Sequence, residues 1–202
     1  MGREIEIKIP LTDSLYQEIF DFMTGEKSLP GLSLTGKISP LITKQDEYYS
    51  KYKTEVERRA NGEPQVIRLR TDDDGQTKKS YFTLKRKTRQ NGIEVNAEDE
   101  TFVQEPDVLR EFFALAGFFC WFKKQKQAYG VHCNFAKMPG LDYHLELEIV
   151  NNLKYAEIEV TQEAGPADQI RDSLNDFVRA LGLNPENRDA RSWVEIVLGK
   201  CE

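Results

Sequence analysis

The chain has 202 residues, of which 39% are hydrophobic and 31% charged, and its formal net charge is −6. This length fits one large domain or two small ones, and the acidic balance argues against a general nucleic-acid binder, which normally carries a basic face. Three cysteines without CxxC spacing indicate neither a disulfide framework nor a zinc knuckle. No run approaches the ~20 apolar residues of a membrane span, and the first ten residues lack the apolar core of a signal peptide. We therefore predict a cytoplasmic protein that binds neither nucleic acid nor membrane.

Four segments have apolar residues at helical spacing. They predict amphipathic helices over residues 14–23, 107–116, 168–181 and 190–198. Helices of this kind usually cover one face of a sheet. No internal repeat and no long linker rich in proline, glycine or serine divides the chain, so we expect a single domain over residues 1–202.

The predicted strands have one charged and one apolar face. From Glu4 to Ile9, charged residues alternate with isoleucine, the period of two that is typical of a half-buried strand. Arg68 and Arg70 share one face of a second strand, and Lys85 lies on the polar face of a third. Most of these polar faces are dominated by charges of one sign.

The second half of the chain repeats this pattern. Lys124 and Lys126 share a face, whereas residues 144–149 and 157–160 carry glutamate at every second position, with a turn expected at Asn151-Asn152 between them. An exposed sheet face normally mixes both signs, because like charges on adjacent strands repel. Clustered carboxylates can instead share divalent cations, and clustered lysines and arginines can share a polyanion. We therefore expect a closed barrel with both sets around one cavity and helices over its apolar exterior.

The order of these segments resembles the CYTH superfamily, the triphosphate tunnel metalloenzymes. The matching motifs are ExExK at residues 4–8, DxYY at 46–49, RxR at 68–70, the strand lysine at Lys85, ExE at 98–100, KxR/K at 124–126 and LGxFxEIE at 152–159. The resemblance covers essentially the whole chain. It implies an α+β fold, with a closed antiparallel β-barrel of about eight strands that is flanked by helices.

The resemblance also implies roles for individual residues. The carboxylates that look like ligands of Mg²⁺ or Mn²⁺, or lie close to them, are Glu4, Glu6, Glu148, Glu157 and Glu159. For Glu148, the pattern leaves open whether it or Glu146 faces inward. The cations that look like the triphosphate cradle are Lys8, Arg68, Arg70, Lys85, Lys124 and Lys126. Glu98 and Glu100 would hold some of these cations in place.

The chain departs from the family pattern at two places. Asn96 stands where the family often has an arginine before ExE, so one phosphate contact of the family is not expected here. Leu153 and Tyr155 replace the glycine and the phenylalanine of LGxFxEIE, so we expect a different turn before this strand.

Such a site implies phosphoryl or nucleotidyl transfer, in which catalysis is mainly positioning and charge neutralisation. Hydrolysis of inorganic, thiamine or nucleoside triphosphate ranks first, because a water nucleophile demands less of the site. A class IV adenylate cyclase, which converts ATP to cyclic AMP and pyrophosphate, is the alternative. A polyphosphate-binding module without catalysis is the third reading, since fold resemblance does not guarantee activity. The substrate is thus a small-molecule triphosphate, and a homodimer is a possible oligomeric state.

Overall fold

The computed structural model describes residues 2–63, 65–90, 93–162 and 167–199, with side chains described except at 2–4, 87–90, 93–95, 161–162 and 167–168. The strands are β1 (Gly2–Leu11), β2 (Leu32–Leu34), β3 (Ile42–Ser50), β4 (Gln65–Asp73), β5 (Lys78–Gln90), β6 (Ile93–Val103), β7 (Phe119–Phe135), β8 (Asp142–Val150) and β9 (Leu153–Gln162). The helices are α1 (Asp13–Thr24), α2 (Glu55–Ala60), α3 (Pro106–Leu115), α4 (Ala167–Ala180) and α5 (Trp193–Leu198), with a 3-10 turn, η1, at Pro185–Asn187. None of these described helices is long and apolar enough to cross a membrane.

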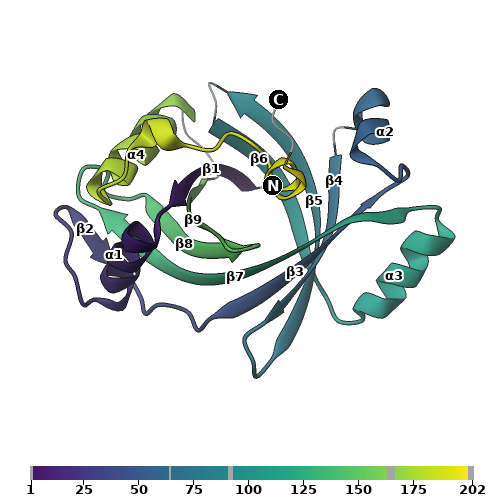
Figure 1. The fold of residues 1–202 in the computed structure, drawn as a ribbon, viewed down its shortest axis with the longest axis horizontal. Helices are drawn as coiled ribbons and strands as arrows, with labels where there is room; N and C mark the ends of the chain where they lie inside the picture. The colour runs from purple at the N-terminus through teal and green to yellow at the C-terminus, as the bar shows by residue number, and fades with distance from the viewer. Residues whose placement is uncertain (1, 64, 91–92, 163–166, 200–202) are drawn as a thin grey trace.

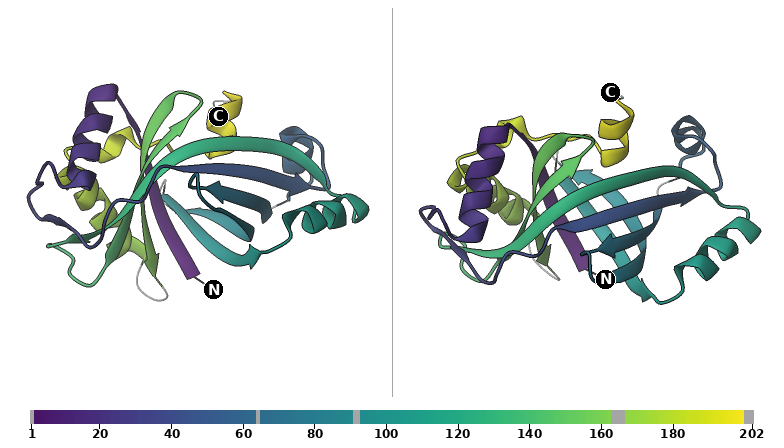
Figure 2. Two further views of the ribbon diagram at one scale, coloured as in Figure 1. Left: turned by 90° about the horizontal axis from the view of Figure 1, so that it is seen from below. Right: turned by 60° about the horizontal axis from the view of Figure 1, so that its bottom comes forward.

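The strands form one antiparallel sheet in the order β2-β7-β3-β4-β5-β6-β1-β9-β8, with a further pairing between β7 and β8. The sheet curls strongly, and the long β7 runs across both halves of the molecule (Figures 1 and 2). Together with the five helices, this arrangement confirms the predicted α+β class.

The prediction of a closed barrel is wrong. The first part of β7 pairs with β3 and the second part pairs with β8, so that only Gln127 and Ala128 pair with both neighbours. Because β3 and β8 meet β7 along different stretches, the wall is complete only near these two residues. The sheet is therefore an open half-barrel whose concave face remains accessible.

The apolar outer face of the sheet packs against helices at one end. Ile5, Ile7 and Ile9 of β1 are buried in the same cluster as residues of α1 and α4. The ring of Tyr143 in β8 stacks on Phe177 of α4, with the ring centroids 4.4 Å apart. Each fully buried large apolar side chain stabilises the fold by roughly 1.5–3 kcal/mol, so this cluster anchors the sheet. The alternation within β1 consequently turns its charged residues toward the concave face.

The other end of the outer face is covered by α3. Phe113 of this helix packs against Tyr49 of β3 and Leu69 of β4, and all three side chains are buried. Leu69 lies between Arg68 and Arg70 in β4, so its burial on the outer face directs both arginines inward.

Three of the predicted helices are confirmed to within one residue at each end, as α1, α3 and α4. The fourth begins later than predicted, because Ser192 caps it: its side chain accepts from the backbone N–H of Glu195, and Glu195 returns the contact. Sequence reasoning missed α2, although Thr54 and Glu57 form the same kind of capping box at its start.

The turn between β8 and β9 is confirmed. Asn151 and Asn152 have φ values of 49° and 67°, as a two-residue hairpin turn requires at both central positions. Asparagine tolerates this left-handed conformation better than other residues with a side chain. The turn therefore forms without the glycine of the family motif.

Candidate functional site

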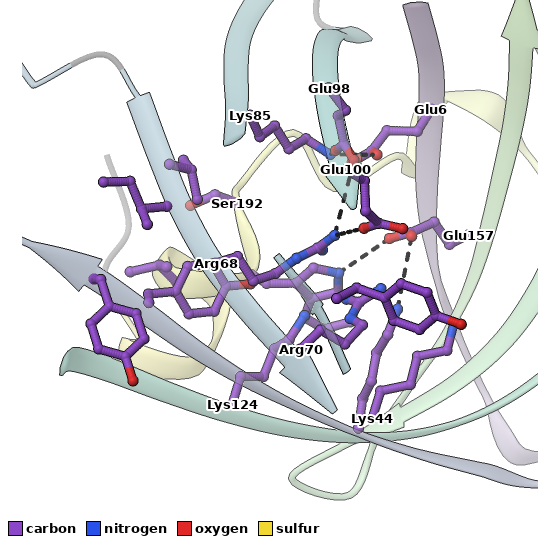
Figure 3. A pocket seen from close by; sticks show the side chains of 18 of the residues that line it. Glu6, Lys44, Arg68, Arg70, Lys85, Glu98, Glu100, Lys124, Glu157 and Ser192 are labelled. Carbon is purple, nitrogen blue, oxygen red and sulfur yellow. Dashed lines mark hydrogen bonds and ion pairs between the residues drawn. The ribbon is translucent and has the colours of Figure 1, made fainter. Parts of the chain in front are cut away.

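The concave face of the half-barrel lines a cavity of about 660 Å³ (Figure 3). This volume lies within the range of ~300–1,000 Å³ that is typical of small-molecule sites. The cations of the strands that line it are Lys44, Arg68, Arg70, Lys85, Lys124 and Lys126. Carboxylates from β1, β6, β8 and β9 line the same cavity. An acidic protein thus gathers a local group of cations in one place.

Asp46 in β3 orients two of these cations. Nε and Nη2 of Arg70 donate to its two carboxylate oxygens at 2.6 and 3.0 Å, and Nζ of Lys124 lies 3.1 Å away. Asp46 is only 1% exposed. Burial alone would raise the pKa of this carboxyl, but the charges of Arg70 and Lys124 hold it well below its usual range. Asp46 is therefore ionised and fixes the positions of both cations.

Carboxylates of β6 hold the cations of β4 and β5. Nη2 of Arg68 donates to Thr83 at 3.1 Å and to Glu100 at 3.3 Å. Lys85 forms an ion pair with Glu98. These contacts agree with the supporting role that the sequence analysis gives to Glu98 and Glu100.

Lys126 lies among the carboxylates of β8. It forms ion pairs with Glu148 and, at 3.3 Å, with Glu146, and Glu146 also pairs with Lys44. Glu146 and Glu148 are two residues apart in the same strand, so both face inward. Glu146 lines the cavity, whereas Glu148 is fully buried behind it.

The carboxylates of β1 and β9 face each other across neighbouring strands. Glu6 pairs in register with Glu159, and Lys8 with Glu157. Burial, together with the charges of Glu157 and Glu6, raises the pKa of Glu159 to about 7. Nε1 of Trp193 donates to Glu157 at 3.1 Å. The raised pKa of Glu159 shows that negative charge is concentrated where β1 and β9 meet.

The acidic group fits a divalent cation. Glu146, Glu148 and Glu157 each offer a carboxylate oxygen, and these oxygens lie within 4.8 Å of one another. Oε2 of Glu148 is buried without a hydrogen-bond partner among the described residues. Burial, with the nearby Glu157, raises the pKa of Glu148. A bound cation would give Oε2 of Glu148 a partner and would favour the ionised form of this carboxyl. Oxygen ligands of this kind suit Mg²⁺ or Mn²⁺.

Among the predicted site residues with described side chains, Lys8 and Glu148 do not line the cavity. Lys8 is buried with its Nζ 3.3 Å from Glu6, beside the lining residues. Glu4 belongs to β1, but its side chain lies outside the described part of the chain. The other predicted cations, and Glu6, Glu157 and Glu159, do line the cavity.

Sequence reasoning missed Lys44 and Asp46 as site residues. They lie two residues apart in β3, and they pair in register with Lys126 and Lys124 of β7. The period of two within β3 could have placed both on the charged face. A single sequence does not reveal the register between β3 and β7, which places these two residues beside Lys126 and Lys124.

Two short helices also contribute to the lining of the cavity. Arg58 and Arg59 of α2 line it, as do Ser192 and Trp193 at the start of α5. An ion pair between Arg59 and Glu195 joins the two helices. Nζ of Lys124 lies 5.1 Å from the centroid of the Trp193 ring, so α5 packs directly against the cationic wall.

No protein-family model and no curated protein matches the sequence, so the comparison rests on solved structures. A protein from Pyrococcus horikoshii OT3 superposes with a TM-score of 0.70 at 19% identity, over 98% of this chain and 99% of that one. A proposed adenylate cyclase from Vibrio parahaemolyticus gives a TM-score of 0.66 at 15% identity, over 96% and 97% of the two chains.

A third similar structure comes from Hippeastrum. It is a proposed adenylyl cyclase with a dominant triphosphatase activity, and it superposes with a TM-score of 0.64 at 16% identity over 100% of this chain and 98% of that one. Likeness at these identities concerns the fold, and it extends over nearly the full length of each chain. The protein therefore shares the fold of these structures, in agreement with the CYTH-type triphosphate tunnel fold that its motifs predict.

Proposed function

We propose that the protein is a divalent-metal-dependent triphosphatase that hydrolyses inorganic, thiamine or nucleoside triphosphate. The observation that carries this proposal is the division of one cavity into a cationic side, from β3, β4, β5 and β7, and an acidic side, from β1, β8 and β9. A buried polyanion requires paired charges, which the cationic side offers. The acidic side would repel phosphate, so it favours a metal-dependent reaction over a module that only binds polyphosphate.

The residues of the chain would divide the work between binding and positioning. Arg68, Arg70 and Lys124 would bind phosphate oxygens and align the triphosphate. Because Asp46 already holds two of these cations, little reorganisation is needed when the transition state forms. A divalent cation held among Glu146, Glu148 and Glu157, with Glu6 and Glu159 on the neighbouring strands as further carboxylates, would neutralise phosphate charge when bound and lower the pKa of an attacking water.

A class IV adenylate cyclase is the second candidate. Two of the similar structures carry the name of proposed adenylate cyclases, and Val66, Ile67 and Trp121 give one part of the cavity wall an apolar character that suits a nucleoside. Cyclisation of ATP requires more than hydrolysis, since the 3′-hydroxyl must be held in line with the α-phosphorus.

The test is a panel of triphosphates with Mg²⁺ or Mn²⁺, with the products separated by chromatography. We expect inorganic triphosphate to yield pyrophosphate and orthophosphate at least as efficiently as ATP is hydrolysed, and ATP to release orthophosphate.

Lys124→Ala should lower kcat/KM for the triphosphate by roughly 10–100-fold, the value of a hydrogen bond to a charged group. Lys123→Ala is the matched control, because Lys123 is the adjacent residue of β7 and its side chain is 70% exposed. Equal amounts of cyclic AMP and pyrophosphate from ATP, with inorganic triphosphate intact, would show that the cyclase alternative is right.

A further inference from the structure

One side of α3 is apolar and exposed. Val108, Phe112 and Leu115 are 64%, 59% and 82% exposed, and their spacing of four and three residues places them on one side of the helix. We call these three residues the α3 stripe. The opposite side of α3 carries the buried Phe113. The helix lies at the end of the molecule opposite α1 and α4, with α2 at the same end (Figures 1 and 2). Apolar side chains gathered in this way commonly mark a contact surface.

The stripe has opposite charges at its two ends. Glu105 precedes the helix and Asp107 lies in its first turn, so the N-terminal end is acidic, whereas Glu111 lies near the middle of the exposed side. At the other end, Nζ of Lys53 lies 4.9 Å from the centroid of the Phe119 ring.

Lys51 lies at the same basic end, with its Nζ 5.6 Å from the centroid of the Phe118 ring. The backbone N–H of Phe118 donates to the carbonyl of Phe113, so these aromatic residues adjoin the C-terminal end of α3. Within the described part of the chain, no ion pair involves Lys51, Lys53, Glu105 or Glu111, so these charges are available to a partner.

We propose that the α3 stripe is the contact surface of a homodimer, in which the two α3 helices pack antiparallel across a two-fold axis. A two-fold axis brings each residue of the stripe into the interface twice. An antiparallel arrangement sets the acidic end of one helix against the basic end of the other, and this attraction also occurs twice. A parallel arrangement would place like charges together. The distribution of charge therefore favours a second copy of the chain as the partner, in the antiparallel orientation.

This surface is separate from the cavity. The α3 stripe faces away from the sheet, and neither its residues nor the four charged residues around it line the cavity. Formation of the dimer therefore does not depend on the reaction proposed above. Triphosphate turnover, measured on the same samples, keeps a failure of one proposal distinct from a failure of the other.

The oligomeric state of the purified chain tests the proposal, by light scattering after size exclusion and by sedimentation velocity. We expect a dimer for the unmodified chain and a monomer for Phe112→Asp and for Leu115→Asp. The matched control is Val56→Asp, because Val56 is 68% exposed on α2 and lies outside the stripe. Circular dichroism should show that all three variants are folded.

Charge reversal tests the orientation. Lys51→Glu with Lys53→Glu should weaken the dimer by about tenfold or more, as should Glu105→Lys, whereas the three changes together should restore it. A monomeric unmodified chain, or a dimer that Phe112→Asp leaves intact, would overturn the proposal. Failure of the combined reversal to restore the dimer would overturn the antiparallel arrangement. If the chain is monomeric and binds phosphatidylcholine vesicles through the stripe, the partner of the stripe is a membrane surface and not a second copy of the chain.

Discussion

Asp46 organises the cationic wall although it has no role of its own in binding an anion. Its carboxylate holds Arg70 and Lys124 from opposite neighbouring strands, and it is almost fully buried. Removal of one partner from a buried ion pair is costly, because the remaining charges stay buried and uncompensated. The DxYY motif thus supports the site by positioning two cations.

We expect Asp46→Asn to lower the free energy of unfolding by about 3 kcal/mol or more near neutral pH. The pKa of Asp46 is depressed in the folded state, so its contribution is fully present above the unfolded value of about 3.9 and is lost as the pH falls through the folded value. The difference between wild type and variant should therefore shrink below about pH 4, as measured by urea unfolding. Asp107→Asn, at a side chain that is 92% exposed, is the control. A difference that does not depend on pH would contradict this role.

Glu159 tests the acidic side of the cavity, because burial and the charges of Glu157 and Glu6 disfavour its ionised form. Glu159→Gln should abolish turnover that depends on a divalent cation, and it should leave stability without metal unchanged or slightly higher, since repulsion is relieved. Kinetics against Mg²⁺ concentration and thermal unfolding in a chelator measure the two effects. Full activity in Glu159→Gln, and equally in Glu4→Ala and Glu6→Ala, would exclude these residues as metal ligands.

At the scale of elements, the period of the hydrophobic pattern was enough to predict the long helices and the inward faces of most strands. Isoleucine at every second position of β1, for example, determines which face is buried. The start of α5 was misplaced, because the capping contact at Ser192 outweighs the apolar pattern that extends before it. α2 was missed because a helix of six residues is too short to show a period.

The open barrel could not be predicted from alternation. A period of two shows which side chains share a face, but it contains no information on how far a strand pairs with each neighbour. Here β7 divides its length between β3 and β8, and only Gln127 and Ala128 are shared. The pairing of Asp46 with Lys124 depends on that same register. The positions of individual charges were therefore predictable, whereas their ion-pair partners were not.

For the whole molecule, charge is separated within one cavity while the chain as a whole is acidic. The strand pattern and the family resemblance predicted five of the lining cations, but not the contribution of α2 and α5. Arg59 and Glu195 are 136 residues apart in sequence and meet only because the fold brings α2 and α5 to the same cavity. Such a contact depends on the complete fold, and no local pattern indicates it.

This separation of charge predicts that triphosphate stabilises the whole fold. The cations come from strands throughout the sheet, so a ligand that joins them opposes unfolding of all these strands together. A ligand that binds only the native state, at a concentration of about 100 times its Kd, adds about 2.7 kcal/mol to the free energy of unfolding. For a chain of this size, this raises Tm by roughly 5–10 °C.

Thermal unfolding with inorganic triphosphate, and with orthophosphate at the same concentration and ionic strength, measures this effect. Orthophosphate reaches fewer cations, so its shift should be much smaller, and Lys124→Ala should reduce the triphosphate shift while Lys123→Ala leaves it unchanged. Equal shifts with both anions would mean that the cations do not act as one site.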